Sequence, residues 1–141
     1  MTLPMLPVAA ARAYPPRVSA FTAPFWNALA QGHWRTVRCT SCARATFPPK
    51  PVCPHCWSTG MEWTDLQPRG QIYAWTRVHA APAVFAHEAP YACGIVDLED
   101  GLRIACRLVA EPDQPLRIGA AVDMVVLQYQ DGPLFAARPR G

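Results

Sequence analysis

Four cysteines in two identically spaced pairs are the residues of this sequence with the clearest chemistry. Cys39 and Cys42 form one C-x2-C pair, and Cys53 and Cys56 form another after ten intervening residues. Two such pairs can place four thiolates at the corners of a tetrahedron, which binds Zn²⁺ and leaves no coordination position open. The spacing therefore predicts a structural zinc site rather than a catalytic one. A four-sulfur shell also accepts iron, so iron stays open.

Disulfides and a redox C-x2-C centre are the alternatives to a metal. Disulfides need an oxidising compartment, but the apolar N-terminus lacks the basic start of a secretory signal, and Pro4 and Pro7 interrupt it. A redox centre is expected beside a β-α-β unit, which the sequence does not predict. We therefore expect a cytoplasmic protein with reduced cysteines, in which the metal stabilises a proline-rich segment.

The metal site needs elements around it, and a helix is predicted just before it. Residues 1–20 are expected to form an irregular arm, because prolines oppose both helix and sheet. The helix is predicted over residues 21–34, with Thr22 as its N-cap, Pro24 in its first turn and Gly32 as its stop. One face of it carries Phe25, Trp26, Leu29 and Ala30. We expect this face to pack on the chain's own core rather than on a partner.

A different pattern follows the cysteine segment, which we place at residues 35–66. Polar and apolar residues alternate, and this predicts strands over residues 70–79, 91–98, 102–109, 122–130 and 133–138. Five short antiparallel strands within residues 67–141 fit a small closed barrel such as an OB-fold, and a sandwich is the alternative.

The first predicted strand carries the most ligand-like residues. Strict alternation places Tyr73, Trp75 and Arg77 on one face together with His79. Aromatic rings on a barrel face can stack an adenine, including that of coenzyme A, and an arginine can bind phosphate. Packing of this face beneath the helix explains the aromatic residues equally well.

The two remaining cysteines lie in the second and third predicted strands. A tight turn at residues 99–101 pairs these strands so that Gly94 lies opposite Cys106 and Cys93 lies opposite Arg107. The two cysteines then point to opposite faces of the sheet. Cys106 is expected in the core, and inert burial is favoured for Cys93 over a role as a nucleophile.

His87 and Glu88 lie in the long loop after the first strand, where an acid–base pair is conceivable. No nucleophile motif, phosphate loop or second metal motif accompanies them, so we expect solvated loop residues. The sequence therefore predicts no catalytic set. A stand-alone enzyme that uses Cys93 or His87 is the least favoured function.

Taken in order, these segments resemble a known family of zinc-ribbon and OB-fold proteins that accompany acyl-CoA enzymes. The stretches that carry the resemblance are PFWNALAQGHW, RCTSCARATFPPKPVCPHCWS, GQIYAWTRVH, PYACGIVDLEDGLRIACRLV and LRIGAAVDMVV, within about residues 20–137. The resemblance implies a mainly β protein, with an N-terminal helix and a rubredoxin-like zinc ribbon followed by a five-stranded OB-fold barrel. The four family cysteines match Cys39, Cys42, Cys53 and Cys56.

The same resemblance implies a function without catalysis by this chain alone. Such proteins accompany thiolase-like enzymes or acyl-CoA hydratases, so we expect a non-catalytic accessory subunit that docks on such an enzyme and helps to bind acyl-CoA. Assembly into a homo-oligomer stays open. A nucleic-acid-binding OB and zinc-ribbon module is the alternative, but the net charge is only +3 and no basic cluster exists. No stretch of the sequence is long and apolar enough to span a membrane.

Overall fold

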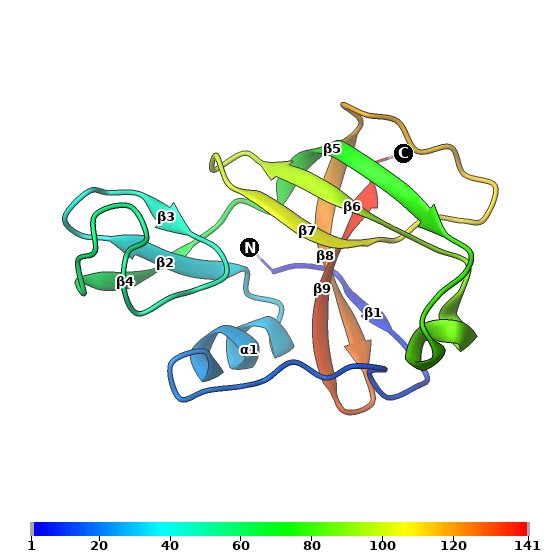
Figure 1. Cartoon of the computed structure of the whole chain (residues 1–141), viewed down its shortest axis with the longest axis horizontal. Helices are drawn as coiled ribbons and strands as arrows, with labels where there is room; N and C mark the ends of the chain where they lie inside the picture. Colours follow the sequence, from blue (N-terminus) through cyan, green and yellow to red (C-terminus); the bar gives the residue numbers. More distant parts are fainter. Residues whose placement is uncertain (1, 141) are drawn as a thin grey trace.

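A five-stranded β-barrel forms the larger part of the fold, and a computed structural model describes it together with the rest of residues 2–140 (Figure 1). The barrel strands are β5 (Arg69–Val78), β6 (Tyr91–Leu98), β7 (Arg103–Leu108), β8 (Ala121–Tyr129) and β9 (Gly132–Pro139). They follow the order β8-β5-β6-β7-β9 and close back onto β8, with β7 and β9 parallel and the other neighbours antiparallel. This closed ring confirms the predicted OB-fold barrel over the sandwich.

The N-terminal arm departs from the irregular structure predicted for it. Met5–Pro7 form strand β1, which pairs in parallel with Val126–Gln128 of β8. Strand β5 pairs with β8 only at Ala121–Asp123, so the later part of β8 keeps a free edge that β1 occupies. Further along the arm, Arg12 binds Asp131 through its amide at 2.8 Å and its guanidinium at 2.9 Å. The arm is therefore part of the barrel sheet.

Helix α1 (Ala23–Ala30) is shorter than the helix predicted at residues 21–34. Thr22 occupies the N-cap position without capping, because its hydroxyl oxygen accepts the amide hydrogen of Ser19 at 2.8 Å. Gly32 ends the helix as predicted. It adopts φ +84°, a left-handed backbone conformation that favours glycine. The amides of Gly32 and His33 donate hydrogen bonds to carbonyl oxygens of the last helical turn. Across residues 2–140, no helix is long and apolar enough to cross a membrane.

A separate three-stranded sheet, to the left of the barrel in Figure 1, carries the cysteine segment. It consists of β2 (Arg35–Cys39), β3 (Ala45–Thr46) and β4 (Met61–Asp65), antiparallel in the order β3-β2-β4. Helix α1 contacts β2 of this sheet and also β8 and β9 of the barrel. The helix therefore connects the two β structures.

Five aromatic side chains join the helix, the ribbon sheet and the barrel, and we call this cluster the aromatic joint. Its members are Phe25 and Trp26 of α1, Trp34, Phe47 and Phe135 of β9. The ring centroids of Phe47 and Phe135 are 5.3 Å apart, and that of Phe25 lies 5.7 Å and 6.1 Å from them. Phe25 and Leu29 are buried and Trp26 packs against the core, which confirms that the apolar helix face packs on the chain's own core, but Ala30 is exposed and is not part of the buried face.

Strands β6 and β7 pair in the predicted register. Gly94 lies opposite Cys106 and Cys93 lies opposite Arg107, so the two cysteines point to opposite faces of the sheet. Cys106 packs against the barrel core, and burial raises the pKa of its thiol to about 12. A thiol with so high a pKa stays protonated and unreactive at neutral pH.

Gly94 is a position where no side chain fits, because a Cβ there would meet the backbone carbonyl oxygen of Ala74 and lie 3.0 Å from Leu108. We expect Gly94→Ala to lower the free energy of unfolding by about 1–3 kcal/mol, the usual cost of overpacking. Urea denaturation measures this, with Cys93→Ala as a control on the opposite face of the same strand. A loss no larger than that of the control would contradict the close approach.

Candidate functional site

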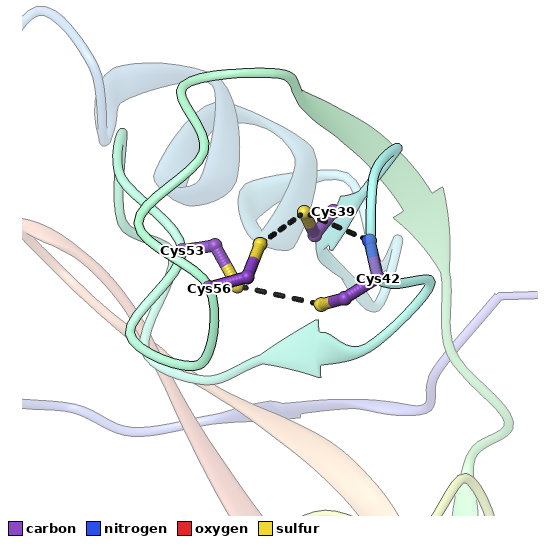
Figure 2. Close-up of side chains that lie close together, drawn as sticks. All are labelled: Cys39, Cys42, Cys53 and Cys56. Carbon is purple, nitrogen blue, oxygen red and sulfur yellow. Dashed lines mark hydrogen bonds between the residues drawn. The ribbon is translucent and has the colours of Figure 1, made fainter.

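The four predicted cysteine ligands come together at one end of the ribbon sheet (Figure 2). Their sulfur atoms all lie within 4.8 Å of one another, with 3.5 Å between those of Cys39 and Cys56 and 3.6 Å between those of Cys42 and Cys53. Four sulfurs at about 2.3 Å from one ion would lie about 3.8 Å apart in a tetrahedron. The donor set and its spacing therefore fit Zn²⁺.

Two matching turns of the chain hold the sulfurs. In each turn, the sulfur of the first cysteine accepts backbone amide hydrogens from the following residues at 3.4 Å. The residue after each pair has positive φ, 65° at Ala43 and 66° at Trp57, and its amide bonds back to the carbonyl of Cys39 or Cys53. This left-handed step closes each turn, so that both sulfurs of a pair can face one point.

The turns also change the acidity of the thiols. The amide hydrogen of Cys42 is the largest influence on Cys39 and lowers its pKa to about 6. Burial raises the pKa of Cys53, but amide hydrogen bonds from its own turn outweigh burial, and the pKa is lowered. The amide of Ser58 lowers the pKa of Cys56, but the neighbouring thiols and burial outweigh it and raise the pKa to about 12. A divalent ion that binds here must therefore displace a proton.

His55 lies within the second cysteine pair but outside the sulfur cluster. Its side chain is exposed, and its Nδ1 lies 3.3 Å from a guanidinium nitrogen of Arg44. The four thiolates already complete a tetrahedral shell, so His55 is not needed as a ligand.

Tyr73, Trp75 and Arg77 do not share the single face that strict alternation predicts. The pairing of β5 with β6 shifts between Ile72 and Ala74, so Tyr73 is the extra residue of a β-bulge. After the bulge the alternation resumes out of phase. Trp75 and Arg77 are now in register with core-side positions of β6, and Tyr73 is separated from them.

Tyr73 lies instead in a cation–π pair on the outer face of the barrel. The guanidinium of Arg103 lies 3.5 Å from the Tyr73 ring centroid and donates two hydrogen bonds to Asp97, at 2.7 Å and 3.2 Å. The hydrogen bond from Arg103 lowers the pKa of that carboxyl. Further along the same strands, Arg107 lies over the Tyr91 ring at 4.0 Å.

Between these two cation–π pairs, the outer face of β5, β6 and β7 is apolar. A hollow of about 590 Å³ lies here. Ala74, Thr76, Cys93, Ile95 and Ala105 of this face line it, and so do Trp75, Gly94 and Cys106 at core-side positions of the same strands. A second hollow of about 510 Å³ also touches Ala105, reaches the aromatic joint and includes Arg17 and Arg103 in its lining. We call the two together the apolar trough. Cys93 lies half-buried in this trough, so the predicted full burial of this residue is wrong, whereas its inertness stays a prediction.

Glu88 is not the solvated loop residue that was expected, although His87 beside it is exposed. The Glu88 side chain is only 16% exposed and accepts hydrogen bonds from Arg107 at 3.0 Å and from the Tyr129 hydroxyl at 3.4 Å. These partners lie 19 and 41 residues away along the chain. No local pattern in the sequence could have indicated this cluster, because only the folded barrel brings the three residues together.

Two family descriptions match this chain. The description "ChsH2, rubredoxin-like zinc ribbon domain" matches residues 26–62, and "ChsH2, C-terminal OB-fold domain" matches residues 63–127. Together the matches extend from helix α1 through the four cysteines to strand β8 of the barrel.

Relatives and solved structures agree with these matches. A DUF35 domain-containing scaffold protein of Methanocaldococcus jannaschii is 37% identical over 67% of this chain and 68% of its own length. A probable enoyl-CoA hydratase alpha subunit of Thermomonospora curvata is 33% identical over 70% of this chain and 31% of its own length. The benzoylsuccinyl-CoA thiolase subunit BbsA of Thauera aromatica is 31% identical over 67% of this chain and 63% of its own. The solved structure of an Ltp2-ChsH2(DUF35) aldolase superposes with a TM-score of 0.77 at 29% identity, covering 89% of this chain and 98% of that chain.

Proposed function

Since this chain belongs to the DUF35 family, whose matching domains are a rubredoxin-like zinc ribbon and an OB fold, we propose that it is an accessory subunit of an acyl-CoA enzyme complex. In this proposal the chain docks on a thiolase-like enzyme or an acyl-CoA hydratase subunit, contributes to binding of the acyl-CoA and performs no catalysis itself. The observation that carries the proposal is that relatives aligned with 67% and 70% of this chain are named as subunits of a thiolase and a hydratase.

The zinc ribbon supports a structural role in this proposal. Cys39, Cys42, Cys53 and Cys56 would hold the ion, and a Zn²⁺ held by four thiolates has no open position for substrate or water. Bound zinc would supply folding energy to the ribbon. The ribbon and helix would then present a fixed surface to the partner enzyme.

The apolar trough supports the acyl-CoA part of the proposal. Its floor is formed by small and aliphatic residues on an outer barrel face, where the acyl and pantetheine chains could replace water over apolar side chains. Arg17 lines the end near the aromatic joint, where it could bind phosphate, whereas Arg103 at the same end already donates two hydrogen bonds to Asp97. Of the three residues first considered, Tyr73 contacts Arg103 and Trp75 lines the trough, whereas Arg77 lines neither hollow.

The alternative of a nucleic-acid-binding module gains no support from the structure. Carboxylates pair with five of the thirteen basic residues, namely Arg12, Arg35, Arg103, Arg107 and Arg140. A net charge of +3 with this pairing leaves little of the positive surface that phosphate backbones require.

Calorimetry with an acyl-CoA tests the trough. Size-exclusion chromatography with thiolase and acyl-CoA hydratase subunits from the same organism tests docking. We expect Ile95→Glu to weaken octanoyl-CoA binding by about tenfold or more, because it places a carboxylate in the apolar floor. Ile118→Glu is the matched control, since Ile118 is 73% exposed and lies outside the trough.

Absence of acyl-CoA binding by the chain, alone and with its partner, would refute the acyl-CoA part of the proposal. Failure to co-elute would refute docking.

A further inference from the structure

A pocket of about 350 Å³ lies at the opposite end of the β5-β6-β7 sheet from the aromatic joint and shares no lining residue with the apolar trough. Its walls come from the N-terminal arm, from the short helix η1 (Ala83–Glu88) and from strands of the barrel. The residues that matter are Val8, Arg77, Glu88, Arg107, Leu127 and Tyr129. This size is at the low end for sites that hold a small organic molecule.

Most of the polar groups in this pocket already have partners. Glu88 accepts hydrogen bonds from Arg107 at 3.0 Å and from Tyr129 at 3.4 Å. Arg107 also lies over the Tyr91 ring at 4.0 Å, so both its charge and its plane are held. Burial raises the pKa of Tyr129, with a further contribution from Glu88, so the hydroxyl keeps its proton and stays a donor. These residues therefore form a rigid wall.

Arg77 is the group in the pocket without a charged partner. The only hydrogen bond of its guanidinium group among residues 2–140 is a long one, 3.4 Å to the carbonyl of Gln114, and no carboxylate in that part of the chain lies within 4.0 Å of it. Two guanidinium groups and one carboxylate line the pocket, which leaves one net positive charge. A guanidinium fork in a half-buried, mostly apolar site favours a carboxylate or phosphate oxygen pair.

The remainder of the pocket is apolar. Val8 of the arm and Leu127 of β8 belong to a small apolar cluster on this side of the barrel, and both contribute to the lining. An anion that is hydrated all round would gain little from such walls. A molecule with an apolar body beside its charged group would bury that body here.

We propose that this pocket binds a small organic anion, with an apolar body against Val8 and Leu127 and a carboxylate or phosphate head on Arg77. The Glu88–Arg107–Tyr129 cluster shapes the pocket. Because Arg107 is already paired with Glu88, Arg77 is the residue that neutralises the head group. The site is separate from the apolar trough, so the inference does not depend on the proposed acyl-CoA function.

Titration of the full chain with three small aromatic probes, followed by NMR of the backbone amides, tests this site. Benzoate carries a carboxylate head, phenyl phosphate a phosphate head, and benzamide is the neutral analogue. We expect saturable shifts at Arg77 and Glu88 with benzoate, phenyl phosphate or both, and binding of benzamide at least tenfold weaker. The anion that binds better identifies the head group.

Variants decide whether Arg77 holds the anion. Arg77→Gln is expected to weaken binding at least tenfold, and Arg77→Lys, which keeps the charge but not the fork, should fall between it and the native chain. Arg69→Gln on the same strand is the matched control and should bind normally, while unchanged circular dichroism verifies folding. Equal binding of benzamide, normal binding by Arg77→Gln, or no saturable shift with either anion would overturn the proposal.

Discussion

Replacement of Cys53 by serine is expected to remove the metal and unfold the ribbon. Cys53 is fully buried among the other three ligands, and serine supplies no thiolate to complete the tetrahedron. Binding of structural zinc contributes about 10–16 kcal/mol in zinc-finger peptides, so its loss should leave the proline-rich segment at residues 43–52 without a stable fold. Elemental analysis of the native chain should find about one zinc per chain, and the variant should hold almost none.

The same measurement separates the other interpretations of the cysteines. Iron in place of zinc would appear directly in the elemental analysis. Cys93→Ser is the matched control, because Cys93 lies in barrel strand β6 and is not one of the four clustered cysteines. It should keep its metal. Limited proteolysis should cut the Cys53→Ser variant, but not the control, between residues 43 and 52. Full metal content in Cys53→Ser would contradict the four-thiolate site.

The second large effect is expected at the aromatic joint. Phe25 is 3% exposed and its ring lies against those of Trp26, Trp34, Phe47 and Phe135. Phe25→Ala should therefore lower the free energy of unfolding by about 3–5 kcal/mol, through lost apolar burial and the cavity left between the three parts of the fold. Chemical denaturation monitored by tryptophan fluorescence measures this loss.

Two further variants give this prediction its controls. Phe25→Leu keeps much of the apolar volume and should cost less than Phe25→Ala. Tyr14→Ala removes an aromatic ring that is 74% exposed and should change the free energy of unfolding by no more than about 0.5 kcal/mol. If Phe25→Ala behaved like Tyr14→Ala, the joint would not hold helix, ribbon and barrel together. Hydrogen exchange of Phe25→Ala would show which connection of the joint weakens first. A loss of amide protection confined to the ribbon sheet would mean that the ribbon separates from the barrel first.

Local patterns predicted most of the fold. The four cysteines, the glycine stop at Gly32, and the hairpin register that places Cys93 and Cys106 on opposite faces all depend on residues close together in the chain. Short-range sterics and hydrogen bonds decide such features, so a single sequence carries them. The approximate bounds of the five barrel strands follow from the same alternation, but alternation left both a barrel and a sandwich open, and the pairing of β9 with β7 and β8 decides for the barrel.

The errors have a common physical origin in contacts between distant segments. The bulge at Tyr73 depends on how β5 pairs with its neighbours, and one extra residue reverses the face of every residue after it. Strand β1 forms because a free edge of β8 accepts it. Thr22 has the right residue type for a cap, but its hydroxyl is already bonded to Ser19.

The sequence by itself determined the spacing that brings four cysteines together and the order of helix, cysteine segment and barrel strands, because residue type, spacing and periodicity are local properties of the chain. Only the tertiary structure decided which surfaces can hold a ligand. It separated Tyr73 from Trp75 and Arg77, joined Arg107 and Tyr129 to Glu88, and left an apolar trough on the outer barrel face. A pocket forms where segments distant in sequence converge, and their convergence is a result of packing that no local pattern records.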